Sequence, residues 1–237
     1  MSGRLAGRIA LVTGASRGIG AAVARRFALE GAHVVLLART QGGLEEQDDA
    51  IRAEGGAATL VTLDLRQPDD IERFAAAFFE RFGRLDVLVG NAGVLGVLSP
   101  LGHIAPDDWA EVMAVNLSAN WHLIRYFDPL LRRSEAGRAI FVTTHIAADA
   151  PPFWGAYAAS KAALESMVRA WAAEVGRITA IRANLIDPGP VRTRLRAQAF
   201  PGEVAVSLRA PDTVTDGFVD LAAADCQRNG DVLRLAE

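Results

Sequence analysis

Short apolar runs alternate along the whole chain with longer segments of helical spacing. The runs, rich in Val, Ile and Leu, read RIALVT, HVVLLA, ATLVTL, LDVLVG, AIFVTT, ITAIRANLI and DVLRL. Helical spacing marks residues 18–30, 41–54, 68–82, 106–131, 155–176 and 211–224. This alternation predicts an α/β, doubly wound fold: a seven-stranded parallel sheet with helices on both faces. Ligands of such sheets bind at the carboxyl ends of the strands, so the residues ending each run are the first functional candidates.

Composition narrows the classes of protein that the chain can belong to. With 237 residues, 51% of them hydrophobic, residues 1–237 are expected to form a single domain. A net charge of -3 with scattered arginines disfavours nucleic-acid binding. Cys226 is the single cysteine, so the chain cannot form an internal disulfide. The start of the chain does not resemble a leader, and no apolar stretch is long enough for a membrane span. We therefore expect a cytoplasmic protein that neither enters a membrane nor binds a metal, since its four histidines are dispersed.

A glycine-rich turn follows the first apolar run. It reads TGASRGIG and leads directly into a helical segment, which is the context of a dinucleotide-binding (Rossmann) loop. Gly14, Gly18 and Gly20 suit a tight turn, a close approach of backbone to pyrophosphate, and close packing of helix on strand. The helix N-terminus adds N–H donors and a favourable dipole. The loop predicts a cofactor site that also includes Ser16, Arg17 and Ile19.

The end of the second run indicates which nucleotide is bound. It reads LLART, with Ala38 and Arg39 where a carboxylate would bind a ribose 2′-hydroxyl. Arg17 and Arg39 are instead placed to bind an extra 2′-phosphate, which favours NADP(H) over NAD, although either could be an ordinary solvated arginine. Asp64, followed by Leu65, ends the third run and is a candidate partner for the adenine amino group. The alternative role for Asp64 is to cap the next helix.

Lys161 is the only lysine of the chain, which otherwise has 24 arginines, and it stands four residues after Tyr157 in YAASK. Residues four apart on a helix share one face, so both side chains can enter one site. A compact ammonium next to a phenol stabilises the phenolate, and we expect it to lower the pKa of Tyr157 toward the working range. The alternative is that Lys161 is an exposed lysine that follows a tyrosine by chance. The other tyrosine, Tyr126, lies in an apolar helical segment and is expected to serve in packing.

Five motifs in order and spacing make the chain resemble the short-chain dehydrogenase/reductase family from Arg8 to about Thr193. They are TGASRGIG, GNAG at Gly90 to Gly93, Asn116 in VNL, YAASK, and Pro188-Gly189 followed by Thr193. The resemblance implies a nicotinamide-dependent enzyme with Tyr157 as acid/base and Lys161 on the cofactor ribose. It further implies that Asn116 holds a relay water, Thr193 contacts the carboxamide and Asn91 braces the sheet. The implied cofactor positions also include Ala92, Gly93, Pro188, Gly189 and Val191.

Two positions depart from the family pattern. Thr144 stands where the family has a serine that binds the substrate oxygen; it keeps the hydroxyl and adds a methyl group, so we expect retained activity in a tighter pocket. Thr143 is the alternative candidate for this serine position if the loop carries an insertion. Gly90 replaces the first asparagine of NNAG, for which we expect a local effect.

The sequence leaves the substrate open. His145, Phe153, Trp154, Leu95 and Phe200 fall on loops expected to overhang the nicotinamide, where they suit an apolar carbonyl or alcohol substrate or else pack among themselves. The irregular stretch 195–211 is expected to cover the substrate.

Three readings of the function follow. The leading hypothesis is an NADP(H)-dependent carbonyl reductase or alcohol dehydrogenase. The alternatives are a non-catalytic cofactor-binding regulator and an enzyme that reduces 3-oxoacyl carrier protein. Arg192, Arg194 and Arg196 are candidates for the basic entrance that a carrier-protein substrate needs, or else form a solvated helix face. By resemblance, the helices at 106–131 and 155–176 form the interface of a homodimer or homotetramer.

Overall fold

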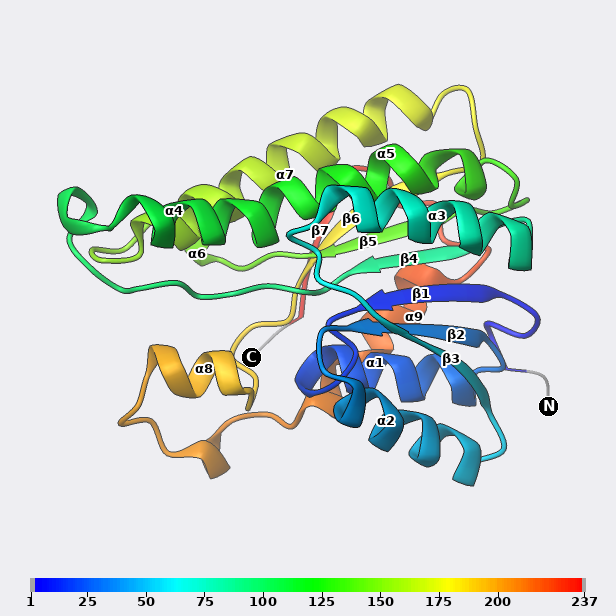
Figure 1. The fold of residues 1–237 in the computed structure, drawn as a ribbon, viewed down its shortest axis with the longest axis horizontal. Helices are drawn as coiled ribbons and strands as arrows, with labels where there is room; N and C mark the ends of the chain where they lie inside the picture. The colour runs from blue at the N-terminus through cyan, green and yellow to red at the C-terminus, as the bar shows by residue number, and fades with distance from the viewer. Residues whose placement is uncertain (1–2, 236–237) are drawn as a thin grey trace.

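The computed structural model describes residues 3–235 and contains a single seven-stranded sheet among them. Its order is β3-β2-β1-β4-β5-β6-β7, and every pair is parallel, as the sequence predicted (Figure 1). The strands are β1 (Ile9–Thr13), β2 (His33–Ala38), β3 (Ala57–Thr62), β4 (Val87–Gly90), β5 (Arg138–Val142), β6 (Arg182–Asp187) and β7 (Val232–Arg234). The order reverses between β1 and β4, and a crevice is expected at such a switch point.

Helices cover both faces of the sheet. They are α1 (Gly18–Leu29), α2 (Gln41–Ala53), α3 (Pro68–Phe82), α4 (Pro106–Met113), α5 (Ala119–Leu131), α6 (Ile146–Asp149), α7 (Gly155–Val175), α8 (Arg194–Ala199) and α9 (Thr215–Ala222). In Figure 1, α3, α5 and α7 lie above the sheet and α1 and α2 below it. The buried side chains of α9 belong to the same core as those of α1 and α2. Within residues 3–235, none of these helices combines the length and apolar character needed to span a bilayer.

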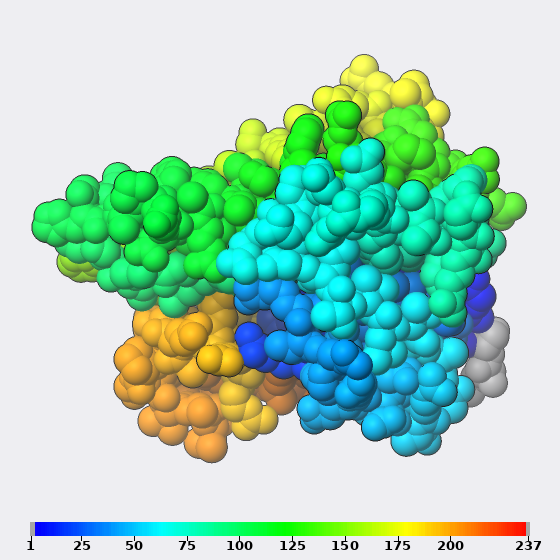
Figure 2. Space-filling view, in the orientation of Figure 1, coloured from blue at the N-terminus to red at the C-terminus, as the bar shows by residue number. Residues whose placement is uncertain are grey.

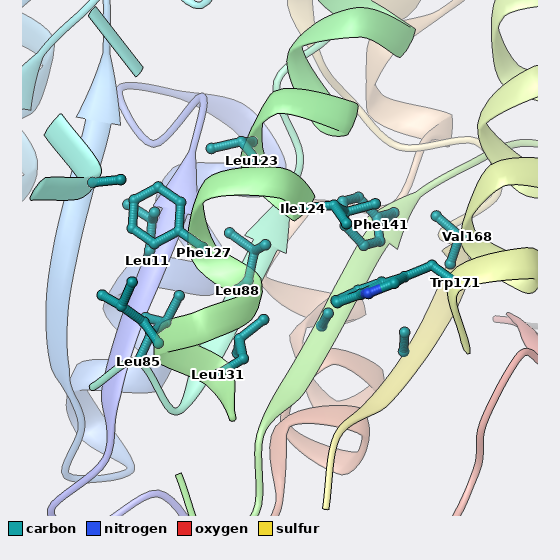
Figure 3. Packing of buried hydrophobic residues seen from close by; sticks show 14 of the residues in the cluster. Leu11, Leu85, Leu88, Leu123, Ile124, Phe127, Leu131, Phe141, Val168 and Trp171 are labelled. Carbon is teal, nitrogen blue, oxygen red and sulfur yellow. The ribbon is translucent and has the colours of Figure 1, made fainter. Parts of the chain in front are cut away.

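Each face of the sheet has its own hydrophobic core. On one face, Leu11 and Leu88 of the sheet meet Phe127 of α5 and Trp171 of α7, with Phe141 edge-on to Trp171 at 6.4 Å between ring centroids (Figure 3). The other core joins the alternate side chains of the same strands to α1, α2 and α9. Strands buried on both faces are continuous apolar runs, which explains why the pattern predicted them so well.

The predicted helix at 106–131 is wrong as a single regular helix. It consists of α4, a π-helical turn (Ala114–Ser118) and α5. The helix predicted at 211–224 likewise starts with a 3₁₀ turn (Pro211–Val214), and α9 ends at Ala222. Further 3₁₀ turns occur at Leu101–His103 and Ala205–Ser207. Apolar periodicity does not distinguish these turns from α-helix, because it reports which residues are buried and not which carbonyl each N–H finds.

Candidate active site

A cavity of about 1440 Å³ opens at the carboxyl edge of the sheet, where the strand order reverses. Figure 2 shows the surface hollowed where the blue N-terminal segments, the green α4 region and the orange segment around residue 200 approach one another. Its walls include most of the predicted site: Gly14, Ser16, Arg17, Gly18, Ile19, Arg39, Asp64, Leu65, Asn91, Ala92, Gly93, Thr144, Tyr157, Lys161, Pro188, Gly189, Val191 and Thr193. Gly20 and Asn116 do not line the cavity; both are buried behind its wall.

The glycine loop has the geometry that a bound diphosphate needs. Gly14 and Gly18 have φ of +66° and +59°, a backbone conformation that is unfavourable for residues with a side chain. A Cβ on Gly20 would lie 2.4 Å from the Gly14 carbonyl oxygen and from Asn91 Nδ2, so this position accepts no side chain. α1 begins at Gly18 and points its first N–H groups toward the cavity edge formed by the loop. The residues present therefore fit a dinucleotide.

Thr13, which the sequence analysis did not select, ties the loop to the GNAG segment. Its Oγ1 donates to the Val89 carbonyl at 3.1 Å and accepts from the backbone N–H groups of Asn91 and Ala92 at 3.0 and 3.1 Å. Asn91 Nδ2 returns a bond of 2.8 Å to the Thr13 carbonyl. Asn91 thus braces β1 against the segment after β4, as the resemblance implied. The threonine that precedes Gly14 in the motif was the signal available for this role.

Two exposed arginines, Arg17 and Arg39, lie at the rim of the cavity. Asp64 faces the same rim, and hydrogen bonds from Arg66 hold its pKa below the ordinary value, with a smaller contribution from the charge of Arg39. The Arg66–Asp64 ion pair measures 2.6 Å. The alternative that Asp64 caps the following helix is wrong, because α3 starts at Pro68 with Gln67 as its N-cap.

Tyr157 and Lys161, both buried on α7, meet inside the cavity. Lys161 Nζ lies 5.9 Å from the centroid of the Tyr157 ring and donates a hydrogen bond of 2.8 Å to the carbonyl of Val142, at the end of β5. The two side chains are 8% and 4% exposed. The alternative of an exposed, incidental lysine is therefore excluded.

The protonation of this pair differs from the expectation. Burial, followed by the negative charge of Asp187, raises the pKa of Tyr157 to about 12. Burial alone lowers the pKa of Lys161 to about 8. The expected lowering of the phenol pKa by Lys161 is thus wrong for this structure, because desolvation favours the neutral form of both groups. At neutral pH the phenol carries its proton.

Both threonines considered line the cavity, and they differ in what their hydroxyl groups bind. Thr143 is buried, and its Oγ1 donates to Glu165 Oε1 at 2.8 Å. Thr144 is half-buried, and its Oγ1 is 3.4 Å from the N–H of Ile146 at the start of α6. The hydroxyl of Thr143 is thus hydrogen-bonded to Glu165 of α7.

Asn116 lies in the π-helical turn and is completely buried. Its Oδ1 accepts from Val94 N at 2.9 Å, and its Nδ2 donates to Val94 O and to Ser160 Oγ. Ser160 Oγ in turn donates to the Tyr157 carbonyl at 2.7 Å. The Asn116 side chain therefore connects the segment after β4 to the helix of the tyrosine; whether it also holds a water stays a prediction.

The space left by Gly90 is filled by other side chains. A Cβ at position 90 would be 2.4 Å from Phe141 Cδ1 and 2.5 Å from Asn120 Oδ1. Asn120 Nδ2 also donates to the Asn116 carbonyl at 2.8 Å. The departure from NNAG is thus compensated by Phe141 and by an amide from α5.

The segment after β6 forms the remaining wall. Asp187 Oδ1 accepts from Gly189 N at 3.0 Å, Gly189 has a φ of +68°, and Thr193 Oγ1 caps α8 by accepting from Arg196 N at 3.2 Å. Arg209 holds this segment from outside through the Pro188 carbonyl at 2.5 Å. The turn after β6 is therefore fixed by side chains from three places in the chain.

An aromatic group closes the substrate end of the cavity. The Trp154 ring lies 5.8 Å from Tyr157 and 5.6 Å from Phe200, measured between centroids. Arg196 stacks 3.8 Å from the Phe200 centroid and pairs with Glu203 at 2.6 Å. Leu95 packs in the same group, whereas His145 and Phe153 are exposed, Phe153 with a φ of +75°.

Fold and cavity together define a dinucleotide-binding α/β protein. The chain belongs to the short-chain dehydrogenase/reductase family of oxidoreductases, because the family model described as short chain dehydrogenase matches residues 8–204. It is 36% identical over 224 residues to the oxidoreductase YciK of Escherichia coli K12, covering 93% of this chain and 88% of the relative.

Solved structures match almost the whole chain, among them two short-chain dehydrogenases. A short-chain dehydrogenase from Pseudomonas syringae has a TM-score of 0.96 at 39% identity, covering 99% of this chain and 96% of that one. A short-chain dehydrogenase from Shigella flexneri, complexed with NADP, has a TM-score of 0.94 at 34% identity, covering 99% of each chain.

Proposed function

We propose that the protein is an NADP(H)-dependent oxidoreductase that transfers a hydride between nicotinamide and a carbonyl or secondary alcohol substrate, with Tyr157 as acid/base. The observation that carries the proposal is the burial of Tyr157 and Lys161 together in the cavity that begins at the glycine loop. A buried, protonated phenol in this position is a proton donor for the oxygen of a carbonyl group.

When bound, the cofactor supplies the hydride. The residues of this chain bind the cofactor, orient the substrate and transfer the proton. Gly14 to Gly20 hold its diphosphate, and Arg17 and Arg39 bind a 2′-phosphate. Lys161 binds the ribose, and the Val142 carbonyl orients its ammonium. Pro188 to Thr193 bind the nicotinamide end.

At the substrate, Thr144 donates a hydrogen bond to the oxygen, and Tyr157 gives that oxygen its proton during reduction and takes it back during oxidation. Asn116 keeps α7 in register with the segment after β4. The apolar wall of Trp154, Phe200 and Leu95 favours a substrate with an apolar body and excludes water from the reacting atoms.

NADP is proposed as the cofactor because the rim offers two guanidinium groups where a carboxylate would be needed for NAD. A relative of known structure, from Shigella flexneri, is complexed with NADP, whereas a relative from Mycobacterium tuberculosis is described as NAD-dependent. Replacing Arg39 with Asp is expected to weaken NADPH binding about tenfold or more, since a charged hydrogen bond contributes ~1.5–3 kcal/mol, while NADH binding holds or improves. Arg52→Ala, on the exposed face of α2, is the control; an unchanged preference in Arg39→Asp contradicts the phosphate site.

A second function, reduction of a 3-oxoacyl group on a carrier protein, is favoured by Arg192 and Arg194. Both are exposed at the cavity, whereas Arg196 is engaged by Glu203. Such a substrate carries a phosphopantetheine arm whose phosphate these arginines would meet at the entrance. The third possibility, a regulator without turnover, is disfavoured by the intact proton-handling side chains.

The deciding experiment measures NADPH consumption with a panel of ketones, aldehydes and acyl thioesters. Tyr157→Phe is expected to lower turnover of any accepted substrate by ~10²–10⁴-fold while NADPH affinity, followed by cofactor fluorescence, stays near that of the parent. Undiminished turnover in Tyr157→Phe refutes the assignment. Absence of turnover with the whole panel, together with intact NADPH binding, favours the regulator.

A further inference from the structure

A hydrogen bond between two side chains joins the end of β5 to α7. Thr143, the residue after β5, is 3% exposed, and its Oγ1 donates to Glu165 Oε1 at 2.8 Å. The other oxygen of this carboxylate accepts from Arg169 Nη2 at 2.7 Å. The backbone N–H of Thr143 donates to the Ile186 carbonyl of β6, also at 2.8 Å. Thr143 is therefore held both by α7 and by the neighbouring strand, through a glutamate that the sequence analysis did not select.

Two successive turns of α7 hold two successive residues at the end of β5. Lys161 and Glu165 are four residues apart on α7 and so lie on one face of the helix. Lys161 Nζ donates to the Val142 carbonyl, and Glu165 accepts from the next residue, Thr143. The residue after that, Thr144, lines the cavity and carries the hydroxyl proposed to bind the substrate oxygen. Thr143 thus lies in the chain directly between the carbonyl that orients the ammonium and the hydroxyl for the substrate.

We propose that Glu165 is a positioning residue that acts through Thr143 and fixes the end of β5 against α7. The Val142 carbonyl and the Thr144 hydroxyl flank this fixed point, so both keep their places relative to the α7 side chains that enter the cavity. A hydrogen bond to a carboxylate is stronger than one between neutral groups, which suits it to this role. Displacement of reacting groups by about 1 Å can slow a reaction by about 10²-fold. The inference rests on the proposed function for its catalytic meaning.

Conservative variants separate this positioning role from general packing. Thr143→Val keeps the branched shape and removes the donor, whereas Thr143→Ser keeps the donor. Glu165→Ala removes the acceptor at a half-buried position of α7, where alanine is a good helix former. Thr59→Val is one matched control, because it removes a hydroxyl that lies 2.9 Å from His33 Nε2 on the distant edge strand β3. Glu174→Ala is the other, because it removes an exposed carboxylate from the same helix.

The test reads the placement of Lys161 and needs no substrate. Lys161 is the only lysine, so acetic anhydride acetylates a single ε-amine, and mass spectrometry of the peptide that contains it gives the rate. In Thr143→Val and Glu165→Ala, the Val142 carbonyl is no longer fixed in front of this amine. Its acetylation rate is expected to rise about threefold or more, the size of effect that a lost hydrogen bond produces. Thr143→Ser and the two control variants should keep the rate of the parent.

A parental acetylation rate in Thr143→Val and Glu165→Ala, or an equal rise in the control variants, overturns the inference. If Thr143→Val does not fold, the comparison of Glu165→Ala with Glu174→Ala decides alone. If a substrate is found, turnover per NADPH-binding site should fall about tenfold in Thr143→Val and recover in Thr143→Ser, and unchanged turnover has the same contrary meaning. Failure to find any turnover, by contrast, removes the proposed function and leaves the acetylation result standing.

Discussion

At the scale of the residue, the chain separates two kinds of positive charge. The chain has 24 arginines, most of them on the surface or at the rim, with Arg8 and Arg138 buried away from the cavity, and its single lysine is buried next to the phenol. Arginine stays charged whatever its surroundings, whereas the charge of an ammonium can be tuned by burial. Lys161 therefore brings a titratable cation to the one place where a change in protonation affects chemistry.

The first prediction concerns the pH dependence of reduction. Burial places the pKa of Lys161 at about 8, so its ammonium is present below that pH and is lost above it. The pKa of Tyr157, at about 12, leaves the phenol protonated throughout this range. We expect kcat/KM for NADPH, which reports groups of the free enzyme, to be constant at acidic and neutral pH and to fall as pH rises through about 8.

The measurement is a series of initial rates in one buffer mixture at constant ionic strength. Lys161→Arg should lack this alkaline limb, because its guanidinium does not titrate there, although its larger group is expected to lower the rate at every pH. A parent profile that stays flat from neutral pH to about 10 would contradict the role of the Lys161 charge.

At the scale of the element, the sequence predicted the sheet and the glycine loop and missed how neighbouring elements are joined. The strands and the glycine loop are predicted by local signals. A strand buried on both faces needs apolar residues throughout, and a backbone with positive φ favours glycine, so each requirement determines the residue type at its own position. Asn120 and Asp187 leave no such mark. Their partners are supplied by segments far along the chain, which one sequence does not bring together.

The π-helical turn is the clearest example. Positions 106–131 keep an apolar period throughout, yet the helix widens at Ala114–Ser118, and the carbonyl of Asn116 takes its bond from the Asn120 side chain. That side chain also fills the space beside Gly90. Gly90 and the wide turn are thus two parts of one arrangement between β4 and α5.

This arrangement predicts that Gly90 cannot carry a side chain. In Gly90→Ala, the new methyl group would lie 2.4 Å from Phe141 and 2.5 Å from Asn120, both buried. Overpacking of a buried site costs ~1–3 kcal/mol, and we expect the free energy of unfolding, measured with urea, to fall by this amount. Gly42→Ala in α2, where a Cβ meets no atom within 4 Å, is the control and should not lower stability. Equal stability of the two variants would contradict the packing described for Gly90.

At the scale of the whole molecule, the two sides of the sheet differ in what they expose. The side of α4 and α5 presents Trp109 and Trp121, 38% and 46% exposed, and Arg125 stacks 5.7 Å from the Trp121 ring centroid. On the opposite side, α1 exposes a single large apolar side chain among its residues, Leu29. Exposed tryptophan and arginine are enriched where proteins meet. We therefore keep the expectation that α4, α5 and α7 bring copies of the chain together.

The last prediction tests this association. A carboxylate at position 121 would be buried without a partner in such an interface and would replace the flat ring that Arg125 covers, so Trp121→Glu is expected to dissociate a homodimer or homotetramer. The mass in solution, measured by light scattering over a tenfold dilution, should fall toward 25.2 kDa. Leu29→Glu, which puts the same charge at an exposed apolar position on α1, should keep the parent mass. If Trp121→Glu has the parent's mass at every concentration, or the parent itself is a monomer, this helical face does not hold copies of the chain together.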